Sequence, residues 1–129
     1  MPVPYNEAYG VLADVYLEDS FVLAFGNSDS TLWFDLELVL CERHAAYLGP
    51  KPGEHYDFRR ARLDVSAARI ECEWSGHPPS VDPGGEIDYG NIDSWLVDED
   101  GWDELTGDWG KARLFRSAVT LTITEQRKR

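Results

Sequence analysis

The sequence predicts an all-β protein, an antiparallel meander closed or folded into a barrel or sandwich, with at most one or two short helices. Apolar and polar residues alternate with a period of two over most of the chain. Clusters of Gly, Pro, Asn and Asp separate these stretches, and no long stretch has a helical period. The 129 residues fit one domain, 1–129, with a tail that we expect to be frayed from about residue 126.

The first strands are predicted from alternation alone. Apolar residues occupy every second position over 11–17, a turn is expected at 18–20, and the alternation resumes over 21–25. The clearest strand is 32–40, because a helix would spread its alternating apolar residues around the axis instead of along one stripe. A short helix before residue 11 or over 42–48 would not change the fold class.

The middle of the chain is predicted as strands separated by loops rich in Pro and Gly. Residues 45–54 are expected to form a loop, and 56–65 a strand in which the apolar face changes near Arg59. A β-bulge there would explain the change, since one extra residue reverses the side-chain parity. Residues 70–74 alternate again, and 75–85 contain too many Pro and Gly residues for a regular element.

The last third is predicted to be a series of hairpins. Residues 87–97 are typical of a strand interrupted by a glycine, and 98–101 end in Asp-Gly, which suits a tight reversal. The chain should return over 102–105 and turn again at 107–110. The final strand, 119–124, alternates apolar residues with threonines.

Acidic residues outnumber basic ones. The chain has 24 Asp and Glu against 12 Lys and Arg, a net charge of −12 with a pI near 4.5. This balance argues against charge-driven binding to nucleic acids or anionic membranes. No signal-like pattern begins the sequence, and no apolar run approaches the roughly 20 residues of a membrane span. We therefore expect a cytoplasmic protein whose Cys41 and Cys72 are reduced, with an inter-strand disulfide as the alternative.

The negative charge is concentrated in residues 70–110, the acidic segment. It contains twelve acids and no Lys or Arg, whereas the other 88 residues contain twelve of each, and it holds four of the five tryptophans. Because Trp is enriched at binding hot spots, we predict that this segment binds a basic partner protein. The predicted partner-binding residues are Asp88, Asp93, Trp95, Asp98, Glu99, Asp100, Trp102, Asp103, Asp108 and Trp109.

Interpretations of the same segment that involve no other protein stay open. The acids can form a solvated face while each Trp packs in the core on the other side of its strand. Asp88, Asp93 and Asp108 can accept hydrogen bonds from neighbouring turn amides and so stabilise turns instead of binding a partner. Self-association is another use of the charge, since the basic strip Arg59, Arg60 and Arg62 could meet the acidic segment of a second copy.

Two other classes of function are alternatives. Exposed indoles on a β-sandwich could bind a carbohydrate or another small ligand. A metal-assisted or carboxylate enzyme is the other alternative, with a weak oxygen-rich metal site predicted at Asp82, Glu86 and Asp88. No phosphate-loop, dinucleotide-binding, hydrolase-elbow or zincin motif occurs, so the sequence predicts no catalytic residue and no cofactor. The three histidines, His44, His55 and His77, lie in or beside loops, and we expect them to be exposed.

Two runs, 85–95 (GEIDYGNIDSW) and 105–110 (LTGDWG), resemble a group of small bacterial proteins of unassigned function. The strand 36–40 and the region of Tyr56 are also similar, so the resemblance covers most of the chain. It implies an all-β fold and carries no catalytic residues. A looser resemblance to the immunity proteins of toxin systems, which are often small, acidic and cytoplasmic, implies a basic partner such as a nuclease toxin.

Overall fold

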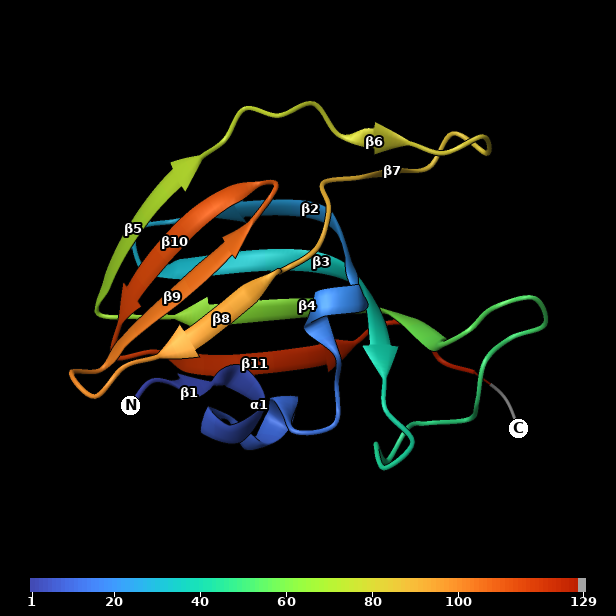
Figure 1. Ribbon diagram of the computed structural model, residues 1–129, viewed down its shortest axis with the longest axis horizontal. Helices are drawn as coiled ribbons and strands as arrows, with labels where there is room; N and C mark the ends of the chain where they lie inside the picture. The colour runs from blue at the N-terminus through green and yellow to red at the C-terminus, as the bar shows by residue number, and fades with distance from the viewer. Residues whose placement is uncertain (128–129) are drawn as a thin grey trace.

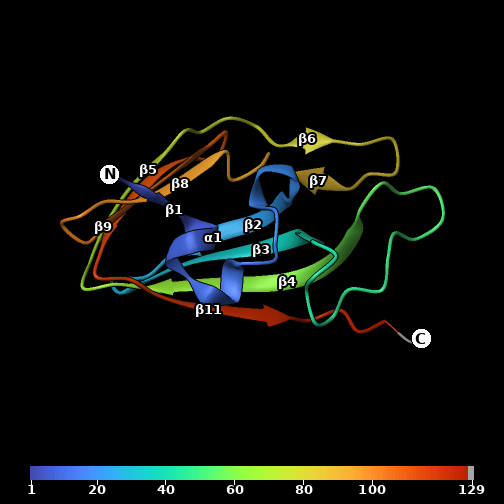
Figure 2. The same ribbon diagram turned by 60° about the horizontal axis from the view of Figure 1, so that its bottom comes forward.

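Two antiparallel β-sheets pack face to face in the computed structural model, which describes residues 1–127 (Figures 1 and 2). One sheet has five strands, in the order β1 (Val3–Pro4), β8 (Ser94–Val97), β9 (Trp102–Gly107), β10 (Gly110–Phe115) and β5 (Arg69–Trp74). The other has four, in the order β11 (Ala118–Ile123), β4 (Asp57–Ser66), β3 (Thr31–Leu40) and β2 (Phe21–Asn27). The all-β prediction is confirmed, and of its two architectures the protein forms the sandwich.

The remaining elements cover the two open sides of the sandwich. The helix α1 (Tyr5–Ala8) and the 3₁₀ turn η1 (Gly10–Leu12) lie against β1, β8 and β11 on one side (Figure 2). On the other side, the small hairpin of β6 (Ser80–Val81) and β7 (Ile87–Asp88) lies near β2 (Figure 1). A second 3₁₀ turn, η2 (Leu17–Asp19), precedes β2. No helix within residues 1–127 is both long and apolar enough to cross a membrane.

The core lies between the sheets and follows the predicted alternation. On β3, Phe34, Leu36 and Leu38 are almost completely buried, and Trp109 meets the Phe34 ring edge to face with centroids 5.0 Å apart. Leu105 contributes from the opposite sheet. Burying each such side chain contributes roughly 1.5–3 kcal/mol, so the two inward faces account for the association of the sheets.

The strand predicted over 11–17 is wrong. This stretch forms η1 and η2, and only Val15 makes an isolated bridge, to Leu40. Leu12 is fully buried while Val11 is 51% exposed, which inverts the expected parity at the start of the stretch, whereas Val15 and Leu17 are buried as expected. The Tyr5 hydroxyl accepts a hydrogen bond from the Leu17 amide (3.0 Å), so this side-chain contact replaces a strand partner for that backbone group.

The bulge predicted near Arg59 is also wrong. The ladder between β3 and β4 is unbroken, and the irregularity lies in β2, between Val22 and Ala24. Asp57 and Arg59 point inward, with 0% and 3% of their surface exposed, on the same face as Ala61. The apparent change of face is therefore a buried ion pair at the end of an otherwise regular strand.

The later hairpins are confirmed. The turn 98–101 joins β8 to β9, and 107–110 joins β9 to β10. The stretch predicted as one interrupted strand, 87–97, is divided between β7 and β8, and Gly90 between them has a positive φ of 83°. Tyr89 and Gly90 instead exchange backbone hydrogen bonds with Val22 (2.7 and 2.8 Å), which ties this segment to the edge of β2.

The carboxyl-terminal end is described as far as Arg127. Its guanidinium donates a hydrogen bond to the Asp57 carboxylate (2.9 Å) and another to the carbonyl of Gly49. Residues 128 and 129 of the predicted frayed tail lie outside the described residues.

Candidate acidic binding site

The distribution of charge in space differs from its distribution along the chain. The acids of β5 lie beside β10, the neighbouring strand, which carries Lys111 and Arg113. Lys111 pairs with Glu73 (3.1 Å) and Arg113 with Glu71 (3.5 Å). Exposed pairs of this kind contribute about 0–1 kcal/mol each to stability, but they neutralise the outer face of the five-stranded sheet.

Two of the predicted partner-binding tryptophans belong to the core. Trp95 and Trp109 are each only 2% exposed, so they cannot contact a partner in this fold. Trp102 is half-buried, and the Arg113 guanidinium covers its ring at 4.4 Å. Of the five tryptophans, only Trp74 is exposed, at 41%. The surface therefore lacks the set of free indoles that the carbohydrate-binding alternative expects.

Asp103, another predicted contact residue, is also buried, at 1% exposed. Its carboxylate accepts hydrogen bonds from the Trp95 indole (2.8 Å) and from the Tyr9 hydroxyl. Burial and this bond to Asp103 raise the pKa of Tyr9, which stays a neutral donor. Asp103 thus links the amino-terminal segment to β9 and does not face solvent.

The acids at the tip of the β8–β9 hairpin are exposed. Asp98 accepts hydrogen bonds from the backbone amides of Asp100 (2.9 Å) and Trp102 (3.0 Å), so its side chain stabilises the turn. Glu99 forms an ion pair with the amino terminus at Met1. The tip lies at one end of β9, and the turn 107–110 lies at the other (Figure 1).

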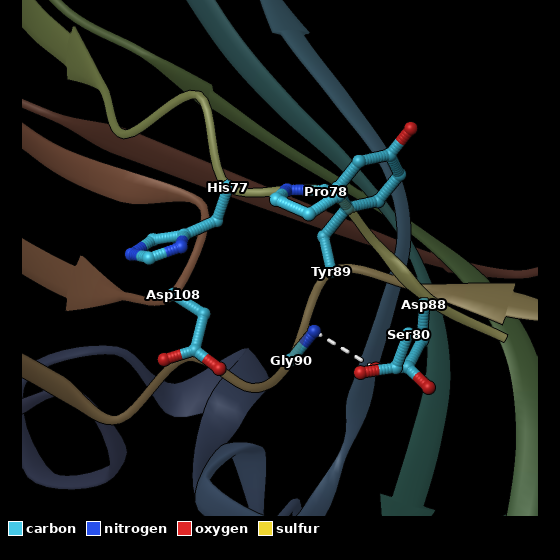
Figure 3. Close-up of a pocket in the computed structure, with 7 residues that line it drawn as sticks. All are labelled: His77, Pro78, Ser80, Asp88, Tyr89, Gly90 and Asp108. Carbon is cyan, nitrogen blue, oxygen red and sulfur yellow. Dashed lines mark hydrogen bonds between the residues drawn. The ribbon is translucent and has the colours of Figure 1, made fainter.

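Beyond that other end, two of the predicted residues, Asp88 and Asp108, line one hollow of about 160 Å³, which we name the acidic pocket. Its lining residues are His77, Pro78, Ser80, Asp88, Tyr89, Gly90 and Asp108. Figure 3 shows Asp108 and His77 on one side and Asp88 and Ser80 on the other, with Gly90 between them. Asp93 does not line the hollow, but its carboxyl group is within range of the Asp108 charge: burial first and that charge second raise the pKa of Asp93.

Local backbone geometry holds this arrangement in place. Gly90 has the left-handed conformation that glycine tolerates best, and its amide donates to Asp88 Oδ1 (2.9 Å). A Cβ at Gly90 would lie 3.0 Å from Asp108 Oδ2, so the bare glycine lets that carboxylate approach. The Ser75 hydroxyl donates to the carbonyl of Asp108, which ties the loop before β6 to the turn 107–110.

Asp88, Asp93 and Asp108 carry the charge of this region without compensation from the described part of the chain. Within residues 1–127, none of the three forms an ion pair with a basic side chain. The turn-stabilising interpretation holds for Asp88 alone, because among the described hydrogen bonds no turn amide donates to the other two carboxylates. The acidic pocket is therefore a concentration of uncompensated negative charge.

The metal site predicted at Asp82, Glu86 and Asp88 is not formed. The three carboxylates have separate partners: Asp82 accepts from the Glu86 amide (2.9 Å), Glu86 pairs with Arg60 (2.9 Å), and Asp88 accepts from Gly90. Across residues 1–127, no group of three or more His, Cys, Asp or Glu side chains is placed to hold a metal ion.

The predicted basic strip is paired within the chain. Arg59 is buried against Asp57, Arg62 pairs with Asp35 (2.6 Å), and Arg60 pairs with Glu86 of the acidic segment itself. A second copy would have to displace these partners to reach the strip. Both cysteines are free thiols: Cys41 is exposed beyond the end of β3, and Cys72 is half-buried on β5 of the other sheet.

The sequence did not single out His77, Ser80 and Tyr89 as lining one pocket. They belong to the Pro- and Gly-rich stretch and the residues after it. The hydrogen bonds of Ser75 to the turn 107–110 and the pairing of 89–90 with β2 bring them together. Comparisons with known proteins add no relative: no family model matches the chain, and no curated protein or solved structure was found to be similar. The resemblance in 85–95 and 105–110 therefore stays a prediction.

Proposed function

We propose that this protein is a non-enzymatic interaction module that binds a basic partner protein at the acidic pocket. Three carboxylates that have no basic partner within residues 1–127 support this function: Asp88 and Asp108 line the pocket, and Asp93 lies within range of the Asp108 charge. Burial raises the pKa of Asp93, and repulsion by the nearby Asp108 charge raises it further. A cationic side chain from a partner would relieve that repulsion and gain hydrogen bonds to carboxylate oxygens.

The chemistry of the pocket favours arginine or lysine as the inserted group. Its volume of about 160 Å³ is small, and carboxylates stand on two of its sides. Guanidinium groups bind carboxylates through two parallel hydrogen bonds, which gives geometric specificity as well as energy. A basic protein that binds phosphates at its own site has the complementary charge. The carboxylates of the acidic pocket could bind at that site in place of the phosphates.

The net charge of −12 supports fast association with such a partner. Complementary fields steer two proteins together and increase the association rate, and added salt weakens this effect. The acidic pocket supplies the place where steering ends in a defined contact.

The test compares two triple variants that remove the same charge at opposite ends of β9. The pocket variant is Asp88→Asn, Asp93→Asn and Asp108→Asn, and the tip variant is Asp98→Asn, Glu99→Gln and Asp100→Asn. Asparagine keeps the oxygen that accepts from Gly90 or from the turn amides, so both variants should fold. Binding of a fluorescent arginine-rich peptide is measured by anisotropy at low and high salt.

We expect the pocket variant to bind the peptide about tenfold more weakly, which corresponds to about 1.4 kcal/mol. The tip variant should lose no more than about twofold, because exposed charges a strand length away, roughly 20 Å, are screened at ordinary ionic strength. Equal weakening in both variants would show that the peptide responds to net charge alone, and the proposed site would be wrong.

A further inference from the structure

A second hollow, of about 400 Å³, lies on the outer face of the four-stranded sheet and has a different chemistry. It is where the loop before β4 meets the start of β2. We name it the aromatic pocket, and its lining residues include Asp19, Phe21, Glu54, Tyr56, Phe58 and Asn91. None of them belongs to the lining of the acidic pocket, although Asn91 directly follows Gly90 in the chain.

The aromatic rings of this pocket occupy positions that should be polar. On β2 and β4, Val22 and Asp57 are buried, whereas their neighbours Phe21 and Phe58 are half-buried on the outer face. The ring centroids of Phe21 and Phe58 are 6.0 Å apart. The Tyr56 ring stands perpendicular to Phe58, at 89° and 5.8 Å. These rings lie outside the core between the sheets, so packing of the sandwich does not explain them.

One hydrogen bond fixes the orientation of the Tyr56 ring. Its hydroxyl donates to Asp19 Oδ2 at 2.6 Å, and Asp19 is presented by η2. The same bond is the main reason that the pKa of Tyr56 is raised, so the ring remains a neutral phenol. A ring that is already oriented loses less conformational entropy when a ligand binds.

The charge around the aromatic pocket is negative. Among residues 1–127, neither Asp19 nor Glu54 forms an ion pair with a basic side chain. Glu37 lies directly opposite Phe21 in the ladder between β2 and β3. Burial raises the pKa of Glu37, the nearby Glu86 and Glu54 raise it further, and Arg60 and Lys51 oppose them. The carboxylates disfavour an anionic ligand.

Aromatic faces beside carboxylates are the surroundings that a cation with an apolar shell prefers. A simple ammonium group would have to reach the Asp19 or Glu54 carboxylate to satisfy its N–H groups, because the ring faces are poor acceptors. A quaternary ammonium has no such groups to satisfy. We propose that the aromatic pocket binds a quaternary alkylammonium group, carried either by a free small molecule or by a trimethylated lysine side chain.

The first test is an NMR titration of backbone amides with choline and with 3,3-dimethylbutanol, its neutral isostere. Choline should shift the amides of Phe21, Tyr56 and Phe58, and the isostere should bind at least about fivefold more weakly because it lacks the charge. Equal binding of the two, no shifts with either, or shifts confined to Gly90 and Asp108 would overturn the proposal. The last result would assign the cation to the acidic pocket instead.

Variants separate the contribution of the ring from that of the charge. Tyr56→Leu should weaken choline binding about tenfold, whereas Phe115→Leu, which removes a half-buried ring from the outer face of the other sheet, should not change it. Asp19→Asn keeps an acceptor for the Tyr56 hydroxyl and removes only the charge, so it tests the site even if Tyr56→Leu fails to fold. An Asp19→Asn protein combined with Glu54→Gln that binds choline as tightly as the parent would contradict the proposal.

The source of the group is decided by a further comparison. A peptide with trimethyllysine and the same peptide with unmodified lysine are titrated beside choline. Tighter binding of the trimethylated peptide than of choline supports the pocket and assigns it to a protein side chain. Tighter binding of choline supports it and assigns a free ligand. Preference for unmodified lysine contradicts it.

Discussion

The buried ion pair of Asp57 and Arg59 offers the sharpest test of how the sandwich is stabilised. The Asp57 carboxylate is 0% exposed and accepts four hydrogen bonds. Two come from the Arg59 guanidinium (3.0 and 3.2 Å), one from the Leu48 amide (2.8 Å) and one from Arg127 (2.9 Å). The Arg59 guanidinium also donates a hydrogen bond to the carbonyl of Ala46 (2.7 Å). One pair therefore joins β4 to the preceding loop and to the carboxyl-terminal end.

We predict that Arg59→Leu lowers the free energy of unfolding by about 3 kcal/mol, the lower end of the usual range for removing one partner of a buried pair, because Arg127 and the Leu48 amide still bind Asp57. The structure supports this size, because two hydrogen bonds to a charged group are lost, each contributing roughly 1.5–3 kcal/mol. Most domains have only about 5–15 kcal/mol in total. Urea denaturation measures the change. The double variant Asp57→Leu, Arg59→Leu should lose less, because neither fully buried charge remains and Arg127, with 21% of its side chain exposed, can turn to solvent.

Acid should weaken the same network. Burial alone would raise the pKa of Asp57, but the bonds from Leu48, Arg59 and Arg127 outweigh it and lower the pKa below its ordinary value. The contribution of Asp57 is therefore fully present above its unfolded pKa of about 3.9 and is lost as the pH falls through the lower folded pKa. Two results together would contradict this role of the pair. The Arg59→Leu variant would lose under about 1 kcal/mol of unfolding free energy at neutral pH, and its unfolding free energy would fall with decreasing pH as steeply as that of the parent protein.

Three further predictions concern single positions. Asp103→Ala should cost about 2–4 kcal/mol in urea denaturation, because the Trp95 and Tyr9 donors lose their buried acceptor, and it should leave binding of the arginine-rich peptide unchanged. Gly110→Ala should lower the free energy of unfolding by more than about 2 kcal/mol, because φ is 140° and a Cβ would lie 2.1 Å from the carbonyl oxygen of Glu73. Gly53→Ala is the control, since φ there is 83° and no atom lies within 4 Å; an equal loss in both variants would refute the clash. Exposed Cys41 should react with a thiol reagent faster than half-buried Cys72. Burial, and then the charges of Asp14 and Glu18, raise the pKa of Cys41, so its reaction rate should still rise above pH 9, and a rate that levels off near pH 8 would contradict this.

The fold was predictable wherever one face of a strand is apolar. Every second residue of β3 from Leu32 to Leu40 is buried, and the Asp-Gly turn of the β8–β9 hairpin has a conformation that few other residues accept. Prediction failed over 11–17, because Tyr5 supplies a hydrogen-bond partner that no local pattern reveals. It failed again at Arg59, since a charged residue that points inward looks like a change of face when its partner is unknown.

The candidate site was less predictable, because charge along a chain is not charge in space. Lys111 lies just outside the acidic segment, yet antiparallel pairing places it beside Glu73 and removes that acid from the charged surface. Successive residues of a strand face opposite sides of the sheet, so Trp95 is buried in the core while Leu96 is exposed. The convergence of Asp88 and Asp108 depends on a loop crossing to the edge of β2, which local patterns do not encode.

The pKa of Asp93 tests the central claim most directly, because Asp93 responds to the Asp108 charge and a cation bound at Asp108 should change that response. Carbon-detected NMR can follow this carboxyl group during an acid titration, with and without the arginine-rich peptide. We predict a pKa above the ordinary value of about 3.9 in the free protein and a lower one when the peptide is bound, since a nearby cation favours the carboxylate. A pKa that stays the same while the peptide saturates the protein would show that the basic group binds elsewhere.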